Sequence, residues 1–224
     1  MPVRLDAIER PAPLALLTGD PRRAFALAGG LMVQPRMSHQ ARGMWGYTGT
    51  TAAGLDLTVQ STGTGGPSAA AVFGDLSRLG VKEVVRLGSC VTGPGGPEPG
   101  SLLLVAGSIC SDGASSALAG NNQTARPDER LQELLSGIAP ETLVSSHDLV
   151  ARLDNDGLPA TGAVARDLQT ATVFALAAKL GVRAASILIV TGGTGADVLD
   201  EAELTKRFLE VGRRVIERFD PPVR

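Results

Sequence analysis

Short apolar runs alternate along this chain with longer segments rich in alanine and leucine. The short runs are nearly continuous in hydrophobic residues, which is typical of strands covered on both faces. They predict strands at Leu14–Leu17, Leu55–Ser61, Val84–Leu87, Leu102–Ser108, Leu143–Ser146 and Ile187–Val190. The longer segments predict helices over Pro67–Leu79, Asp128–Leu135, Leu168–Leu180 and Asp200–Phe219. This alternation indicates an α/β protein, a three-layer α/β/α sandwich around a mixed central sheet.

Glycine and proline mark the ends of these elements. Pro67 suits the first turn of a helix, and Gly80 and Gly181 suit helix ends. Segments 94–100, 154–161 and 192–195 are predicted loops because they combine proline, glycine and turn-forming polar residues. No segment has the composition of a linker between domains. We therefore expect residues 1–224 to form a single domain.

Composition excludes several classes of protein. The 224 residues carry 21 basic and 23 acidic side chains, a net charge of −2, so we expect no binding to nucleic acid or to an anionic membrane. No apolar run approaches the roughly 20 residues needed to cross a bilayer. Two cysteines, Cys90 and Cys110, cannot build a disulfide framework. With no signal peptide visible, a cytoplasmic location is expected.

Two polar segments contain arginines that suit an anion. Gly19-Asp20-Pro21-x-Arg23 follows the first predicted strand, where glycine permits close backbone approach and the arginine fork can bind two phosphate oxygens. The alternative is an ordinary turn with solvated arginines. Segment 42–50 holds Arg42 and the chain's single Trp and Tyr. It is interpreted either as a hairpin with a packed aromatic tip or as a source of a ligand-binding arginine.

Two further segments follow strands. Segment 63–68, Gly-Thr-Gly-Gly-Pro-Ser, leads into a helix and can form a nest of backbone N–H groups for an anion or polar ligand. It fits neither the P-loop nor the dinucleotide-binding fingerprint. Arg86 lies inside an apolar strand before Gly88, Ser89 and Cys90. A buried arginine needs an anion, which is either a ligand or a nearby carboxylate. Cys90 itself is expected to be a small buried thiol.

In their order along the chain, these segments resemble the nucleoside phosphorylase family, which includes purine nucleoside phosphorylases and uridine phosphorylases. Asp167-Leu168-Gln169-Thr170-Ala171 stands at the place of the family's Glu-Met-Glu-x-Ala ribose motif. The Gly-Gly-Pro-Ser form and the stretch 112–115 resemble the uridine phosphorylase branch.

The resemblance implies roles for single residues. Phosphate would be bound by Gly19, Arg23, Arg42, Arg86 and Ser89, with Arg42 reaching across a subunit interface. Ribose and base would contact Thr64, Asp167, Leu168, Gln169, Thr191 and Gly192. Arg86 and Gln169 would be the catalytic residues. The resemblance also implies inorganic phosphate as co-substrate, with no cofactor and no metal, and a homodimer or a hexamer of dimers.

The nucleoside half departs from the family pattern. Gln169 replaces a glutamate that accepts hydrogen bonds from ribose, and Gly192 stands where purine-specific members carry an acid for the leaving base. No clear pyrimidine-binding pair is present after the strand 143–146. His147, Asp148 and Arg152 are the candidates there, although a loop histidine is more often merely exposed, and so is His39 before Arg42.

These observations predict a phosphorylase that splits a nucleoside, with a pyrimidine favoured, into base and pentose 1-phosphate. Three alternatives stay open. The chain is a relative that binds phosphate or a nucleoside-like ligand with little turnover, a purine-acting enzyme, or a hydrolase. The retained arginines disfavour hydrolysis, because water as the nucleophile needs no anion site.

Overall fold

A computed structural model describes residue 5 and residues 7–148, 162–193 and 198–219. Its strands are β1 (Leu14–Thr18), β2 (Val33–His39), β3 (Gly46–Thr50), β4 (Asp56–Ser61), β5 (Glu83–Thr92), β6 (Leu102–Ser111), β7 (Thr124–Ala125), β8 (Glu141–His147), β9 (Ala165–Asp167) and β10 (Arg183–Gly193). Its helices are α1 (Pro21–Leu31), the short 3-10 turn η1 (Ala41–Gly43), α2 (Gly66–Leu79), α3 (Gly113–Ala119), α4 (Glu129–Leu134), α5 (Thr170–Leu180) and α6 (Glu201–Phe219).

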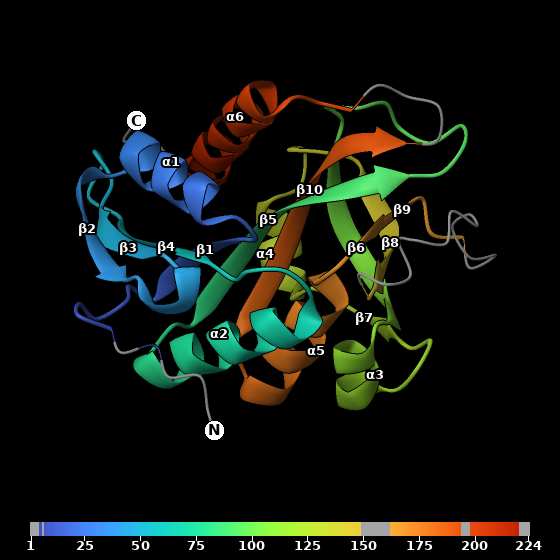
Figure 1. Cartoon of the computed structure of the whole chain (residues 1–224), viewed down its shortest axis with the longest axis horizontal. Helices are drawn as coiled ribbons and strands as arrows, with labels where there is room; N and C mark the ends of the chain where they lie inside the picture. Colours follow the sequence, from blue (N-terminus) through green and yellow to red (C-terminus); the bar gives the residue numbers. More distant parts are fainter. Residues whose placement is uncertain (1–4, 6, 149–161, 194–197, 220–224) are drawn as a thin grey trace.

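One mixed sheet runs through the molecule (Figure 1) in the order β10-β6-β8-β9-β5-β1-β4-β3-β2. β5 is parallel to β1 and β10, and β1 is parallel to β4. β5 also pairs with β9, so that β5, β10, β6, β8 and β9 close on themselves. The carboxyl ends of β1, β4 and β5 therefore lie at the same edge of the sheet, beside the mouth of this closed half.

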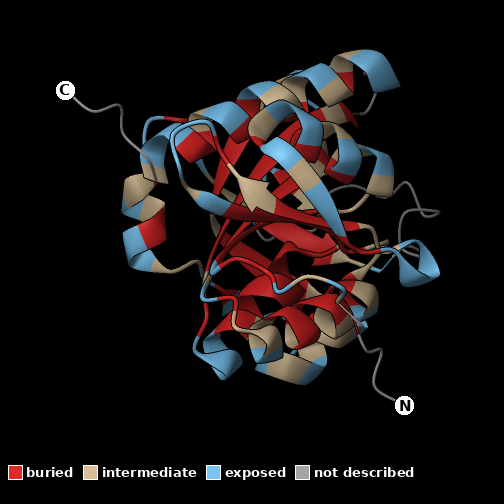
Figure 2. Ribbon diagram, turned by 90° about the vertical axis from the view of Figure 1, so that its left-hand side faces the viewer, coloured by how far each residue is buried: buried red, intermediate tan, exposed pale blue. Residues whose placement is uncertain are grey.

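Helices cover both faces of the sheet. α1 and α6 lie together on one face, and α2, α5 and α3 lie on the other (Figure 1). Each face has its own apolar core: Leu27, Phe208 and Val215 belong to the first, and Phe73, Phe174 and Val190 to the second. Figure 2 shows the buried residues in the interior and the exposed ones on the outer surfaces of the helices. The predicted three-layer α/β/α arrangement around a mixed sheet is confirmed.

All of the predicted strands and helices are present, with shifted ends. β5 and β10 are longer than predicted because each continues through polar and glycine residues past its apolar centre. β10 therefore includes Gly192 and Gly193, so the predicted loop at 192–195 is wrong for these two residues. α5 begins at Thr170, after Gln169 as its N-cap, rather than at Leu168. The loop at 94–100 is confirmed, and 154–161 lies outside the described residues.

Several elements were not expected from the sequence, among them α1, β2, β3, α3 and β9. β2 carries mostly exposed polar positions, so it has no apolar alternation to detect. β2 and β3 form an antiparallel hairpin, and Tyr47 on β3 packs against Phe25 of α1 at 6.0 Å between ring centroids. Segment 42–50 thus holds part of η1 and the second strand of a hairpin, and its tyrosine packs on the strand and not at a tip. None of the helices that the structure describes is long and apolar enough to span a bilayer.

Candidate active site

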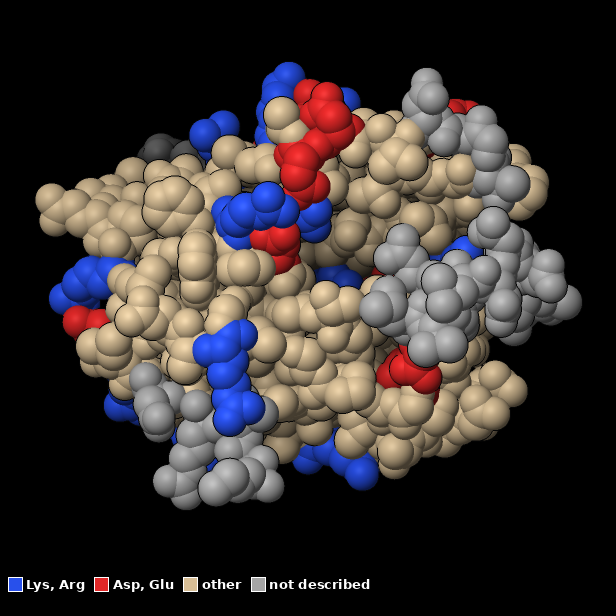
Figure 3. All heavy atoms as spheres, in the orientation of Figure 1, with Lys and Arg blue, Asp and Glu red and all other residues tan. Residues whose placement is uncertain are grey.

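A pocket of about 490 Å³ opens where the carboxyl ends of β1, β4 and β5 meet the mouth of the closed half of the sheet. β1 leads into it through Gly19 and Asp20, and β5 passes along it from Gly88 to Val91. The far wall comes from the ends of β8, β9 and β10. Figure 3 shows this face hollowed near its centre, with basic atoms inside the hollow and charged side chains of both signs at its rim.

The first helix turns its N-terminus to the pocket. The side chain of Asp20 accepts a hydrogen bond from the Arg22 N–H at 2.6 Å and caps α1, and Pro21 opens the first turn. Gly19 and Pro21 line the pocket beside this end. The helix dipole favours an anion at this end, and the capping Asp20 carboxylate already places one negative charge there.

Arg23 follows Arg22 in the first turn of α1 and lines the same pocket. Its Nη2 contacts both carboxylate oxygens of Glu201 at the start of α6, at 2.9 and 3.1 Å. Its guanidinium also stacks over the ring of Phe208, 4.9 Å from the centroid. The Nε atom is buried and has no partner among the described residues. Arg23 is therefore held at the pocket with part of its hydrogen-bonding capacity unused.

Arg86 provides the second cation of the pocket. It is 5% exposed, and its Nη2 donates to Asp167 at 2.8 Å. Its Nε and Nη1 are buried without a partner in the described part of the chain. A side chain at Gly88, two residues along β5, would overlap this guanidinium, so Gly88 leaves the space that Arg86 occupies. Burial lowers the pKa of Arg86 and Asp167 opposes that effect, but arginine stays charged at neutral pH.

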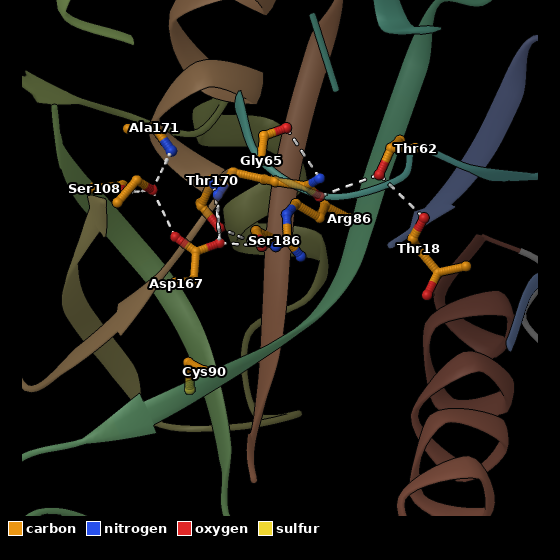
Figure 4. Close-up of polar contacts among 12 residues, drawn as sticks. Thr18, Thr62, Gly65, Arg86, Cys90, Ser108, Asp167, Thr170, Ala171 and Ser186 are labelled. Atoms are coloured by element: carbon orange, nitrogen blue, oxygen red, sulfur yellow. Dashed lines mark hydrogen bonds and ion pairs between the residues drawn. The ribbon is translucent and has the colours of Figure 1, made fainter. Parts of the chain in front are cut away.

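Asp167 is surrounded by donors from the protein. Besides Arg86, it accepts hydrogen bonds from Ser146 Oγ at 2.5 Å, the Gln169 N–H at 3.2 Å, and the Thr170 N–H and Oγ1 at 3.0 and 2.6 Å. Figure 4 shows Asp167, Thr170 and Ser186 on one side of Arg86 and Thr62 on the other. Asp167 thus fixes both the start of α5 and the direction of the Arg86 guanidinium.

The glycine loop between β4 and α2 forms another wall. Gly63 and Gly65 have φ values of +69° and +83°, a region that favours glycine. The Ser68 hydroxyl donates to the Thr62 carbonyl at 2.6 Å, and the Thr62 N–H donates to the Thr18 carbonyl at 2.8 Å. Gln169, the N-cap residue of α5, contacts the loop from the other side. Thr64 at its tip is exposed and lines the pocket.

Apolar side chains also line the pocket. Leu168 follows β9, and Val198, Leu199 and Leu204 lie just before and within the first turn of α6. His147 lines the pocket at the end of β8, with Arg166 nearby. His147 Nε2 is buried with no hydrogen-bond partner within the described residues. Burial is the main cause that lowers the pKa of His147, and the neighbouring Arg166 lowers it further. The imidazole is therefore mostly neutral at neutral pH, and able to donate from one nitrogen and accept at the other.

The sequence matches the Phosphorylase superfamily over residues 13–220. The chain belongs to this superfamily. It is also 31% identical over 215 residues to guanosine phosphorylase of Halorubrum lacusprofundi, covering 92% of this chain and 88% of the relative. A DeoD-type purine nucleoside phosphorylase of Caldanaerobacter subterraneus subsp. tengcongensis is 29% identical, with 92% and 94% covered. One of Clostridium perfringens is 32% identical, with 80% and 81% covered.

In this phosphorylase-superfamily chain, the pocket gathers most of the residues expected at the site. Gly19, Arg23, Arg86, Ser89, Thr64, Asp167, Leu168, Gln169 and Thr191 all line it. Gly192 does not, because it is buried in β10 behind Val198. Arg42 does not line the pocket either. It is exposed in η1, with a positive φ of 57°. A role for Arg42 thus depends on a second subunit.

The three candidates after β8 separate clearly. His147 lines the pocket, whereas the Asp148 carboxylate accepts a hydrogen bond from the Gly113 N–H at 3.1 Å and does not line it. Arg152 lies outside the described residues. His39, on β2, is buried away from the pocket.

Sequence reasoning did not find Glu201, Arg166 and Val198 as pocket residues. The mixed acidic and basic pattern of α6 gives no sign in the sequence of the ion pair between Glu201 and Arg23. Cys90 is a buried free thiol, as expected, and burial raises its pKa far above the ordinary range. Among the described residues, no group of three or more His, Cys, Asp or Glu could hold a metal ion. A reaction without metal or cofactor stays a prediction.

Proposed function

We propose that this chain catalyses phosphate-dependent cleavage of the N-glycosidic bond of a nucleoside, with a purine as the preferred base. The observation that carries the proposal is Arg86, a buried cation with Nε and Nη1 unpartnered at the pocket wall. Such a group is costly to bury unless a ligand anion completes its hydrogen bonds. Ser89, Gly19 and the N-terminus of α1 stand at the same end of the pocket.

Different parts of the pocket would bind the phosphate and the nucleoside. A phosphate at the α1 and β5 end would be held by Arg86, Arg23 and Ser89 and directed at the anomeric carbon of the sugar. A phosphate oxygen forms the new bond to that carbon as the bond to the base nitrogen breaks. The products are the free base and pentose 1-phosphate, and no further reactant is needed.

The base would lie beside His147 and Leu168, which come from the ends of β8 and β9. A departing base gains negative charge, which a hydrogen-bond donor stabilises. Gly192 supplies no such donor, and His147 is the described side chain placed to replace it. A neutral imidazole can donate to a ring nitrogen of the base without a full charge entering the pocket.

The preference for a purine is supported by the names of the similar proteins, a guanosine phosphorylase and two purine nucleoside phosphorylases. The pyrimidine preference predicted from the sequence rested partly on segment 112–115. Asp112 is buried there, where it caps α3 and accepts a hydrogen bond from Thr172 at 3.1 Å, and it does not line the pocket. Residues 112–115 do not line the described pocket, so no contact there supports the pyrimidine preference.

The first experiment is release of free base from guanosine, inosine, adenosine, methylthioadenosine, uridine and thymidine, with and without phosphate. Phosphate-dependent release from guanosine or inosine is the expected result. Release confined to uridine or thymidine would restore the pyrimidine preference. Release without phosphate would indicate a hydrolase, and no release from any substrate would favour a binding protein.

The same assay tests Arg86. Arg86→Ala should abolish phosphate binding measured by calorimetry, but it leaves Asp167 buried without its counter-ion and can unfold the chain. Arg86→Lys keeps the charge and loses the guanidinium fork, so it should fold and bind phosphate at least about tenfold more weakly. Arg183→Ala is the matched control, because that arginine pairs with Glu83 outside the pocket. Wild-type phosphate affinity in folded Arg86→Lys would contradict the assigned site.

A further inference from the structure

The side-chain amide of Gln169 is committed to the glycine loop. Gln169 is 3% exposed and precedes the first turn of α5. Its Nε2 donates to the Gly63 carbonyl at 2.7 Å and to the Gly65 carbonyl at 3.2 Å. Its Oε1 accepts a hydrogen bond from the Thr62 hydroxyl at 3.1 Å. All three partners belong to the segment that joins β4 to α2.

This arrangement requires an amide and excludes a carboxylate. Two carbonyl oxygens face the same atom, and only a group with two N–H donors can satisfy both. The carboxylate of a glutamate at this position would place a negative oxygen against these carbonyls. The replacement of the expected glutamate by Gln169 therefore changes what the side chain does, beyond weakening a hydrogen bond to the sugar.

The two hydrogen bonds also orient the loop peptides. A trans peptide is planar, with its C=O and N–H on opposite sides, so fixing the Gly63 carbonyl fixes the Thr64 N–H. Thr64 lines the pocket, and its N–H makes no hydrogen bond within the described part of the protein. Gly63 and Gly65 would otherwise allow this segment many conformations.

We infer that Gln169 is a positioning residue, which holds the loop 63–65 so that its backbone N–H groups meet the ligand, and that it is not the acceptor for the sugar hydroxyls. This assignment deepens the proposed phosphorolysis and rests on it. It replaces the catalytic role that the family resemblance implied for Gln169.

Gln169→Glu distinguishes the two roles because one predicts a lower kcat/KM and the other a higher kcat/KM. If Gln169 holds the loop, Gln169→Glu lowers kcat/KM by about tenfold or more through loss of two hydrogen bonds. The ratio of kcat/KM for a ribonucleoside to that for its 2′-deoxy analogue then stays at the wild-type value. If Gln169 accepts hydrogen bonds from the sugar, the carboxylate raises both kcat/KM and that ratio, which would overturn the inference.

A second measurement does not depend on activity. NMR order parameters of the backbone amides of residues 63–66 should fall in Gln169→Glu and in Gln169→Met, which has similar length and no N–H donor. Thr62→Val is the matched control, since it spares both bonds to the loop carbonyls and should lower the order parameters less. Unchanged order parameters in both Gln169 variants would overturn the inference. If the wild type releases no base, the proposed function fails while the relaxation experiment still tests the loop.

Discussion

Arg86, Asp167 and Gln169 form a connected set in which each residue fixes the next. Asp167 neutralises Arg86 and orders the start of α5, and the start of α5 carries the amide of Gln169. The pocket thereby combines a fixed guanidinium with a fixed glycine loop, at a small cost in conformational entropy when the ligand binds. His147, on the wall of this pocket formed by the end of β8, is the residue whose protonation is expected to change in mild acid.

His147 should make stability fall in mild acid. Its pKa is lowered by burial first and then by Arg166, and the carboxylates of Asp167, Asp112 and Asp148 oppose the shift. The unfolded chain therefore binds a proton more readily than the folded one, so the free energy of unfolding declines as pH falls below about 6.5 toward the folded value. His147→Gln should remove this part of the decline when urea unfolding is compared at about pH 7.5 and pH 5.

The same variant reports on the base end of the pocket. Loss of the imidazole should lower kcat/KM for the nucleoside about tenfold, the effect of one lost hydrogen bond, with phosphate affinity unchanged. Equal acid sensitivity in the variant and the wild type would contradict the pH argument, and unchanged kcat/KM would remove His147 from the site.

At the scale of elements, α1 and α6 meet above the phosphate end of the pocket. Both helices cover the same face of the sheet (Figure 1). Glu201 at the start of α6 accepts hydrogen bonds from the Arg23 Nη2 group on α1. The carboxylate thus competes with any anion for Arg23. Because the Glu201 side chain is 51% exposed, we expect the ion pair to contribute little to stability.

Glu201→Gln should strengthen phosphate binding by about two- to fivefold, the range expected for releasing a surface ion pair. The free energy of unfolding should change by less than about 1 kcal/mol. Calorimetric titration with inorganic phosphate measures the first quantity and urea unfolding the second. Glu210→Gln is the control, since that glutamate pairs with Arg207 on α6 away from the pocket. Weaker phosphate binding in Glu201→Gln would mean that the pair positions Arg23 for its ligand.

At the scale of the whole molecule, a single subunit leaves the position of Arg42 unexplained. Arg42 is exposed on η1 and does not line the pocket of its own chain. We propose, as the family resemblance implies, a homodimer or a hexamer of dimers in which Arg42 reaches the phosphate of a neighbouring subunit. The cytoplasmic location likewise stays a prediction.

Sedimentation should give a dimer or a larger even-numbered assembly at micromolar concentration, and Arg42→Ala should lose activity without losing its fold. Co-expression of Arg42→Ala with Arg86→Lys chains should restore part of the activity, because a mixed dimer has one site with both arginines intact. A monomer, or no recovery in mixed dimers, would contradict the role of Arg42 across the interface.

The sequence by itself determined the α/β class and the strands with continuous apolar runs. Local signals, such as the glycine after the first strand or the arginine inside an apolar strand, pointed to Gly19 and Arg86 as candidates. The family resemblance, and no local signal, implied that Ser89 binds phosphate. The sequence could not determine the partner of Arg86, and both the carboxylate and the ligand were open. The tertiary structure brings Asp167 to it from 81 positions away and leaves two nitrogen atoms unpaired.

Only the tertiary structure decided the hydrogen-bond partners of Gln169 and the positions of Arg42, Gly192 and Glu201. Hydrogen bonds such as the one from Gln169 to Gly63, 106 positions away, depend on how strands and helices pack, and no spacing in the sequence encodes that distance. The polar strand β2 and the short β9 were missed for the same reason: their pairing with β3, β8 and β5 defines them, not an apolar pattern of their own.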